Sequence, residues 1–160
     1  MSCLSFFRIA AVSAAAVLSC SFASAGDTLS MAVSANVVGT CKLVSVPPLP
    51  FGTLDQVTAP DLNPAAVNVT YRCTKNTGPA TFTVGASSTG TYSGLLANTT
   101  TAGDTIPYTI TWTAPTTAGS GLGTGVTPVI VPLSGHMLGV NYQNVSAGAY
   151  AQAVAVVITP

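Results

Sequence analysis

Few side chains in this sequence combine the residue types and the spacing that catalysis or ion binding requires. The only histidine is His136, and no nucleophile elbow or partner acid accompanies the nearby Ser134. Asp55 and Asp61 lie six positions apart in a proline-containing segment, which does not match the ligand spacing of a calcium loop. We therefore expect no catalytic site at His136, and we expect the two aspartates to serve turns.

The four cysteines offer a different chemistry, because thiols can pair with each other or bind metals. Cys41 and Cys73 lie in apolar segments with alternating side chains, and two cysteines that remain in a secreted chain most simply bond to each other. In the chain-entropy model, closing a loop of about 33 residues stabilises a fold by roughly 3.5 to 4 kcal/mol. Two thiols and the distant His136 do not make a zinc site, so we predict a disulfide and no metal or other cofactor.

The first 25 residues have the pattern of a secretion signal. Arg8 supplies the positive start, residues 9–18 form an apolar core that is too short to span a bilayer, and Ala23–Ala25 forms a small-residue cleavage site. Cys20 leaves lipidation as an alternative, although Leu18 is bulky where such sites favour a small residue. Cleavage after Ala25 leaves 135 of the 160 residues and keeps only two of the four cysteines.

Residues 26–160 carry few charges. The basic residues are Lys42, Arg72 and Lys75, and the acidic residues are Asp27, Asp55, Asp61 and Asp104. Three basic side chains cannot form the patch that nucleic acid requires, so nucleic acid is not an expected partner. A chain so close to neutral gains little protection from charge repulsion, which favours a surface covered by copies of itself over one kept soluble by hydroxyls and amides alone.

Alternating apolar residues predict strands after residue 40, and no helical period is present. The expected strands are residues 42–46, 65–74, 81–84, 92–96, 106–112, 126–133, 137–142 and 148–159. Residues 81–84 are expected to pair back on 65–74 as a hairpin, and residues 148–159 have two apolar faces, which predicts burial on both sides. About seven short strands in 135 residues indicate one all-β sandwich domain.

The most regular strand pattern stands at the start of the mature chain. Its apolar face consists of Leu29, Met31, Val33, Ala35 and Val37. Because no turn or partner strand precedes it, nothing local covers this face. Two hypotheses stay open: the segment is an ordinary first strand of the sandwich, or it is a donor strand that completes the sheet of another molecule.

Several short motifs, taken in order, resemble the spore coat protein U domain family. They are Val-x-Ala-x-Val-x-Gly-Thr-Cys at 33–41, Phe51–Leu54, the strand ending in Cys73, Ile106–Tyr108, and Ala147–Tyr150 before alternating valines. The family includes major subunits of archaic chaperone-usher pili, and the resemblance spans essentially the whole mature chain. Two departures are Gln152, where the family often has Asp, and residues 86–103, which are Thr-rich and hard to align.

The resemblance implies an incomplete immunoglobulin-like β-sandwich that is completed by the N-terminal extension of a neighbouring subunit. The implied organisation is a signal at 1–25, a donor-strand extension at 26–39 and a pilin domain at 40–160. The acceptor groove is expected between residues 42–46 and 148–159. The expected groove residues of the last strand are Tyr150, Val154, Val156 and Ile158.

The implied function is that of a structural subunit of a surface pilus or coat, polymerised by a chaperone-usher route and serving adhesion or biofilm formation. The implied partners are identical or related subunits, a periplasmic chaperone, an outer-membrane usher and a host or abiotic surface. The implied location is the periplasm in transit and then the cell surface or the extracellular space. The alternative is a monomeric secreted adhesive or carbohydrate-binding module, in which Trp112 could stack on a sugar, although we expect Trp112 in the core. An enzyme is the least favoured class.

Overall fold

The computed structural model describes residues 26–160, so the predicted secretion signal at 1–25 lies outside the described residues. The chain divides into two units, one ending at Ala35 and one running from Asn36 to Pro160. In the first unit, residues 26–35 form neither helix nor strand. Among the described residues, no helix has the length and apolar character needed to cross a membrane.

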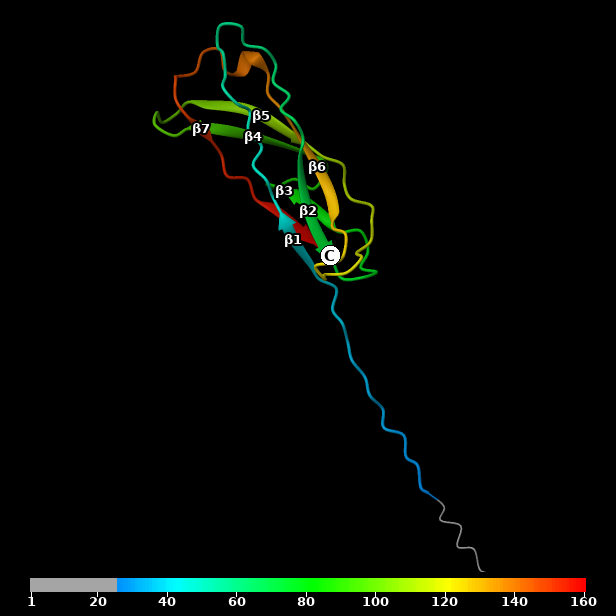
Figure 1. The fold of residues 1–160 in the computed structure, drawn as a ribbon. Coiled ribbons are helices and arrows are strands. Elements are labelled where there is room, and N and C mark those ends of the chain that lie inside the picture. Colours follow the sequence, from blue (N-terminus) through cyan, green and yellow to red (C-terminus); the bar gives the residue numbers. More distant parts are fainter. Residues whose placement is uncertain (1–25) are drawn as a thin grey trace, which may run out of the picture. The chain divides into compact units, whose positions relative to one another are not determined.

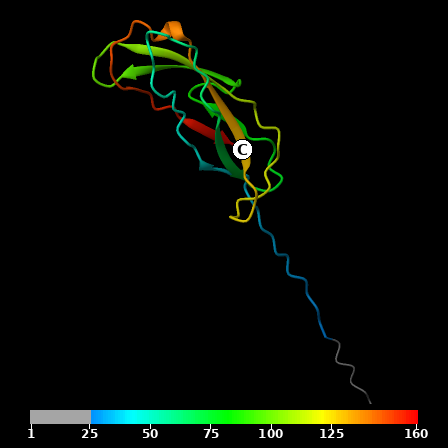
Figure 2. The ribbon, with the colours of Figure 1, turned by 45° about the horizontal axis from the view of Figure 1, so that its top comes forward.

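All strands of the described chain lie in the second unit (Figure 1). They are β1 (Cys41–Ser45), β2 (Val67–Cys73), β3 (Thr81–Val84), β4 (Thr91–Asn98), β5 (Thr105–Thr111), β6 (Val129–His136), β7 (Tyr150–Ala151) and β8 (Val156–Thr159), with a short 3-10 helix, η1 (Gly139–Asn141). Six strands form one antiparallel sheet in the order β1-β2-β6-β5-β4-β7, and β3 pairs with β8 in a second sheet. Figure 2 shows β8, in red, running at an angle to β2 and β6 of the larger sheet.

The core lies on the inner faces of these sheets, as period-two alternation requires. In β2, Val69 and Tyr71 are 1% exposed, whereas Asn68 points away from the core. The other buried apolar residues come from both sheets and the loops after them: Cys73, Ala80, Phe82, Val84, Ile106, Tyr108, Ile110, Trp112, Val131, Leu133, Met137 and Tyr142. The structure therefore confirms an all-β fold of the sandwich type.

The predicted disulfide is present. Cys41 of β1 lies directly opposite Cys73 of β2 in the antiparallel register, and their sulfur atoms are bonded. The bridge ties the first strand of the sandwich to a strand buried at its centre. This prediction is confirmed.

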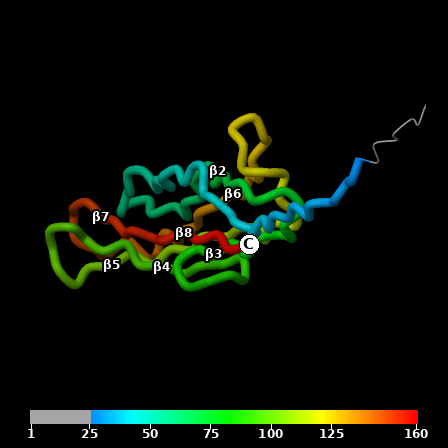
Figure 3. Tube along the Cα trace, turned by 90° about the horizontal axis from the view of Figure 1, so that it is seen from below, coloured from blue at the N-terminus to red at the C-terminus, as the bar shows by residue number. Residues whose placement is uncertain are grey.

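The predicted hairpin between residues 65–74 and 81–84 is wrong. β2 already has β1 on one edge and β6 on the other, so neither edge remains for β3. β3 pairs instead with β8, with Phe82 opposite Ile158 and Val84 opposite Val156. Figure 3 shows β3 and β8 side by side.

The last predicted strand is divided into two short strands that belong to different sheets. β7 pairs with the end of β4, β8 pairs with β3, and residues 152–155 between them belong to no strand. Tyr150, Val154, Val156 and Ile158 pack partly buried on the core, whereas the opposite face is exposed, including Val157 at 47%. The prediction that this segment is buried on both faces is therefore wrong.

The strand predicted at 137–142 is also wrong. Met137 makes only an isolated bridge to Leu62, after which η1 turns the chain so that the buried Tyr142 donates a hydrogen bond to the Pro60 carbonyl at 2.6 Å. Gly139 approaches the Ala59 carbonyl so closely that a Cβ atom would collide with it. A long loop between β1 and β2 is thereby anchored to the end of β6.

Candidate functional site

An apolar groove lies between two segments that are far apart in the sequence. One wall is Val46–Phe51, the other is Gln152–Val156, and the volume is about 380 Å³. The floor consists of residues that also form or contact the core, namely Val67, Val69, Val84, Leu96, Tyr108, Ile110 and Leu133. The groove therefore opens directly onto the interior of the sandwich.

A second hollow of about 920 Å³ continues the first toward η1. Its walls are residues 48–57 and 145–152, and it shares Leu49, Phe51 and Gln152 with the first groove. The two hollows together follow the C-terminal segment from Ser146 to Val156. We call this continuous depression the open groove.

The wall Gln152–Val156 leads into β8, which has an edge that could accept another strand. Within the described chain β8 pairs only with β3, so its other edge has no strand neighbour, and its first residue, Val156, lines the first hollow. An edge of this kind presents backbone N–H and C=O groups to an incoming extended segment.

The opposite wall is less suited to a full ladder. Pro47, Pro48 and Pro50 have no backbone N–H and cannot donate to a neighbouring strand. Leu49 and Phe51 alternate with these prolines and pack partly buried against the core. This wall thus contributes apolar contact, and β8 offers most of the hydrogen bonding.

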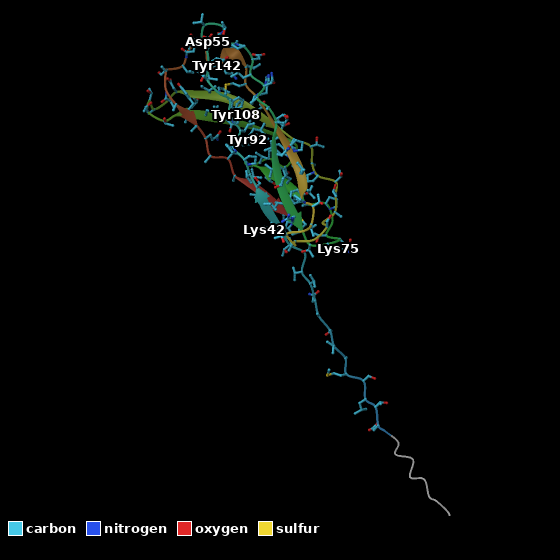
Figure 4. The ribbon with its side chains drawn as sticks, in the orientation of Figure 1. Lys42, Asp55, Lys75, Tyr92, Tyr108 and Tyr142 are labelled. Carbon is cyan, nitrogen blue, oxygen red and sulfur yellow. A yellow bond between two sulfur atoms is a disulfide. The ribbon has the colours of Figure 1, made fainter. Side chains whose placement is uncertain are left out.

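A polar cluster interrupts the apolar surface where the two hollows meet. Gln152 Oε1 accepts hydrogen bonds from the Leu95 N–H at 3.0 Å and from the Tyr108 hydroxyl at 2.7 Å, and its Nε2 donates to Tyr92 Oη at 3.1 Å. Gly94 leaves the space for this cluster, because a Cβ there would lie 2.5 Å from Tyr108 Cζ. Figure 4 shows Tyr92 and Tyr108 near each other. The cluster holds Gln152 against β4 although Gln152 belongs to no strand.

Burial makes the Tyr108 hydroxyl a weaker acid than that of an exposed tyrosine. Desolvation, together with the nearby Tyr92, raises the pKa of Tyr108 to about 12. Its ring also packs edge-on against Phe51, with centroids 5.5 Å apart. Tyr108 is therefore a neutral hydrogen-bond donor that links both walls of the open groove.

The extension carries the apolar residues that the sequence placed on one face. Leu29, Met31, Val33 and Val37 are 79% to 91% exposed, and Ala35 is exposed as well. No residue from 26 to 40 belongs to a strand. The pairing of this segment within its own sheet, expected for an ordinary first strand, is not seen in the described chain.

The structure brings together part of the expected groove and adds residues that the sequence did not indicate. Val154 and Val156 line the first hollow, Tyr150 lines the second, and Ile158 lines neither because it lies opposite Phe82. Of residues 42–46 only Val46 lines the groove.

The sequence pattern did not lead us to expect the wall at 47–51 or the Gln152 cluster. For the wall, the alternation of Leu49 with Phe51 was a usable signal. For the cluster there was none, because Gln152 and Tyr92 are 60 positions apart.

The other candidate residues serve the fold. Trp112 is 7% exposed and its ring packs edge-on against Phe82, which confirms the core placement and contradicts sugar stacking. Asp55 accepts hydrogen bonds from the Val57 N–H and the Thr58 hydroxyl, and therefore serves a turn as expected. Among residues 26–160, no group of three or more His, Cys, Asp or Glu side chains is arranged to hold a metal ion.

A family model described as Spore Coat Protein U domain matches residues 27–157, which is most of the chain. No curated protein matches. Proteins of this family are structural subunits associated with fimbriae and coats, and they are extracellular or surface-associated. The match and the all-β fold agree, and the chain belongs to the Spore Coat Protein U domain family.

Proposed function

We propose that the chain is a structural subunit of a surface pilus or coat and that it polymerises by donor-strand complementation. Residues 29–37 of one subunit would enter the open groove of the next and complete an immunoglobulin-like sandwich. The observation that carries the proposal is the match between an exposed alternating apolar face and a groove whose floor is the core itself.

The lengths of the two elements agree. At about 3.3 Å per residue, residues 29–37 extend over roughly 30 Å. The facing segment, Tyr150–Thr159, has one residue more than the donor. A donor strand beside β8 would direct every second side chain toward the groove floor and the intervening ones, such as Ser34, outward.

The burial energy is large enough to hold subunits together. Burying Leu29, Met31, Val33 and Val37 at about 1.5 to 3 kcal/mol each contributes on the order of 6 to 12 kcal/mol before the cost of ordering the segment. Backbone hydrogen bonds to β8 offset part of that cost. A single junction would therefore be stable.

The same groove accounts for the proposed assembly partners. A subunit with an open apolar groove whose floor includes core residues such as Ile110 and Leu133 is prone to aggregation until something fills the groove. A periplasmic chaperone would cover the groove in transit, and an outer-membrane usher would exchange it for the next subunit. The resulting polymer would serve adhesion or biofilm formation on host or abiotic surfaces.

The proposal is tested by a pair of substitutions on opposite faces of the donor. Val33→Asp places a charge in the middle of the buried face, where desolvation is uncompensated, and should stop polymerisation while secretion continues. Ser34→Asp points outward and should be much milder. The measurement is the ladder of oligomers in unheated SDS samples. High oligomers from Val33→Asp, or equal loss from both variants, would show that this face does not join subunits.

A further inference from the structure

Charged side chains of opposite sign occupy opposite ends of the strand-bearing unit. Lys42 and Lys75 lie at the end that holds the disulfide, and Asp55 lies at the other end, beside Tyr142 (Figure 4). We call the group Lys42, Arg72 and Lys75 the basic end, and the group Asp55, Asp61 and Asp104 the acidic end. Every charged residue from 36 to 160 belongs to one of these two groups.

The basic end holds a like-charge pair. Lys42 of β1 lies directly opposite Arg72 of β2 in the antiparallel register, an arrangement that disfavours the pairing of the two strands. Arg72 donates hydrogen bonds to the backbone carbonyls of Val126 and Thr124 at 2.9 and 3.1 Å. These carbonyls satisfy the guanidinium without neutralising it, so an anionic partner would relieve the repulsion.

The acidic end is bound to backbone donors. Asp61 accepts a hydrogen bond from the Gly139 N–H at 2.8 Å, and Asp104 accepts one from the Ser146 N–H at 2.8 Å. Burial raises the pKa of Tyr142, and the carboxylates of Asp55 and Asp61 raise it further.

The carboxylates of Asp55 and Asp104 stay ionised at neutral pH. Hydrogen bonds from Val57 and Thr58 lower the pKa of Asp55, and hydrogen bonds from Ser146 lower that of Asp104. Asp55 and Ser146 both line the second hollow, so the acidic end borders one end of the open groove.

The extension leaves the unit at the basic end. Thr40 and Thr74 exchange hydrogen bonds, because the Thr74 N–H donates to the Thr40 carbonyl at 2.9 Å and the Thr40 N–H donates to Thr74 Oγ1 at 3.1 Å. Thr74 immediately precedes Lys75. The one remaining charged side chain of the described residues, Asp27, stands near the start of the extension.

The two ends of the segment Tyr150–Thr159, beside which the donor strand is proposed to lie, have different charged surroundings. The Tyr150 end is acidic, since Tyr150 pairs with Asn98 at the end of β4, whose hairpin to β5 contains Asp104. The Thr159 end is basic, since Thr159 pairs with Thr81 beyond the turn at Lys75, and β8 lies near β1.

A donor strand antiparallel to β7 and β8 brings opposite charges together. The basic end of the donor subunit then approaches the acidic end of the acceptor. Parallel insertion brings the two basic ends together.

We infer that the basic end of each subunit docks on the acidic end of the subunit whose groove holds its extension. This second contact between two copies of the chain rests on the proposed function. It supplements the apolar donor strand with an electrostatic contact that orients the incoming subunit and accelerates its docking.

The test uses the complete mature chain, residues 26–160, with polymer dissociated by heat and denaturant, refolded and left to reassemble. Reassembly is carried out at about 10 mM and at about 500 mM salt, between which the Debye length falls from about 30 Å to under 8 Å. Samples taken over time are analysed for oligomers on unheated SDS gels. Wild-type reassembly should be at least about 10-fold slower at the higher salt. Salt strengthens apolar association, so slowing by salt reports on charge.

The double variant Lys42→Glu and Lys75→Glu reverses most of the basic end. At low salt it should assemble at least about 10-fold more slowly than wild type, and added salt should speed it up. The matched control, Lys42→Arg with Lys75→Arg, keeps the charge and should behave as wild type. If the glutamate variant fails to fold, shown by its melting curve, the salt dependence of the wild-type chain decides alone.

The outcomes separate the two proposals. Wild-type reassembly that is unaffected or accelerated by salt overturns the end-to-end contact, and if Val33→Asp still blocks assembly the donor-strand function stands. Assembly of Val33→Asp at the wild-type rate overturns the donor-strand function instead. Equal rates for the glutamate and arginine variants also overturn the end-to-end contact.

Discussion

Residues in β2 and in β8 alternate between more and less buried positions, but the two strands differ in what covers them. β2 lies between β1 and β6, and its residues Val69, Tyr71 and Cys73 are at most 2% exposed. β8 has one strand neighbour, and its inward residues are only partly buried. A strand with two neighbours and a strand with one thus occupy the same domain, and the proposed donor strand would supply the second neighbour of β8.

The largest expected effect comes from removing the donor. A chain that begins at Thr40 should be poorly folded and form no polymer, and a peptide of residues 29–37 should bind it and raise its melting temperature. At a peptide concentration of about 100 times Kd the stabilisation should be about 2.7 kcal/mol. Thermal unfolding with and without peptide measures this. A truncated chain that melts as cooperatively as the full chain and ignores the peptide would contradict the open-groove interpretation.

The next largest effect concerns the disulfide that joins β1 to β2, a strand that already has a neighbour on both edges. Replacing both Cys41 and Cys73 by Ser should lower the free energy of unfolding by about 2 to 5 kcal/mol, because the constraint on the unfolded chain is lost. Denaturant titration measures the change. Mass spectrometry of the non-reduced mature chain is the companion measurement, and two free thiols there would contradict the disulfide.

A matched pair of valines compares the two strands directly. Val69→Ala creates a cavity in a sealed site and should cost about 2 to 3 kcal/mol in the isolated subunit. Val156→Ala should cost about 1 kcal/mol there, because the groove beside it is open. In the polymer the cost of Val156→Ala should increase, since the donor would cover that site. Equal costs in subunit and polymer would mean that β8 gains no cover on assembly.

The smallest effect is on alkaline stability. Because the folded state raises the pKa of Tyr108 to about 12, above the ordinary value of 10, the stabilisation is complete below pH 10 and is lost as pH rises toward 12. The melting temperature of wild type should therefore fall over this range, and Tyr108→Phe should fall less. If the melting temperatures of the two proteins fall equally between pH 10 and 12, ionisation of Tyr108 is not the cause of the lost stability.

Local features of the chain could be predicted from the sequence because they depend on neighbours within a few residues. The period of two in Val67–Cys73 and in Thr81–Val84 places alternate side chains on one face whatever the partner strand is. The two cysteines that follow the predicted signal, Cys41 and Cys73, indicated the disulfide by elimination. The apolar face at 29–37 was equally readable, and its role as a donor strand stays a prediction.

Only the tertiary structure decided which strands are neighbours. β3 pairs with β8 because β2 has no free edge. Residues 148–159 are divided between two sheets because β7 pairs with β4, whereas β8 pairs with β3. Residues 46–51 became a groove wall, and Gln152 came to bridge Tyr92 and Tyr108, through contacts between positions tens of residues apart. Strand pairing and polar clusters depend on which edges remain free after the core has packed, and periodicity along the chain carries no information about that choice.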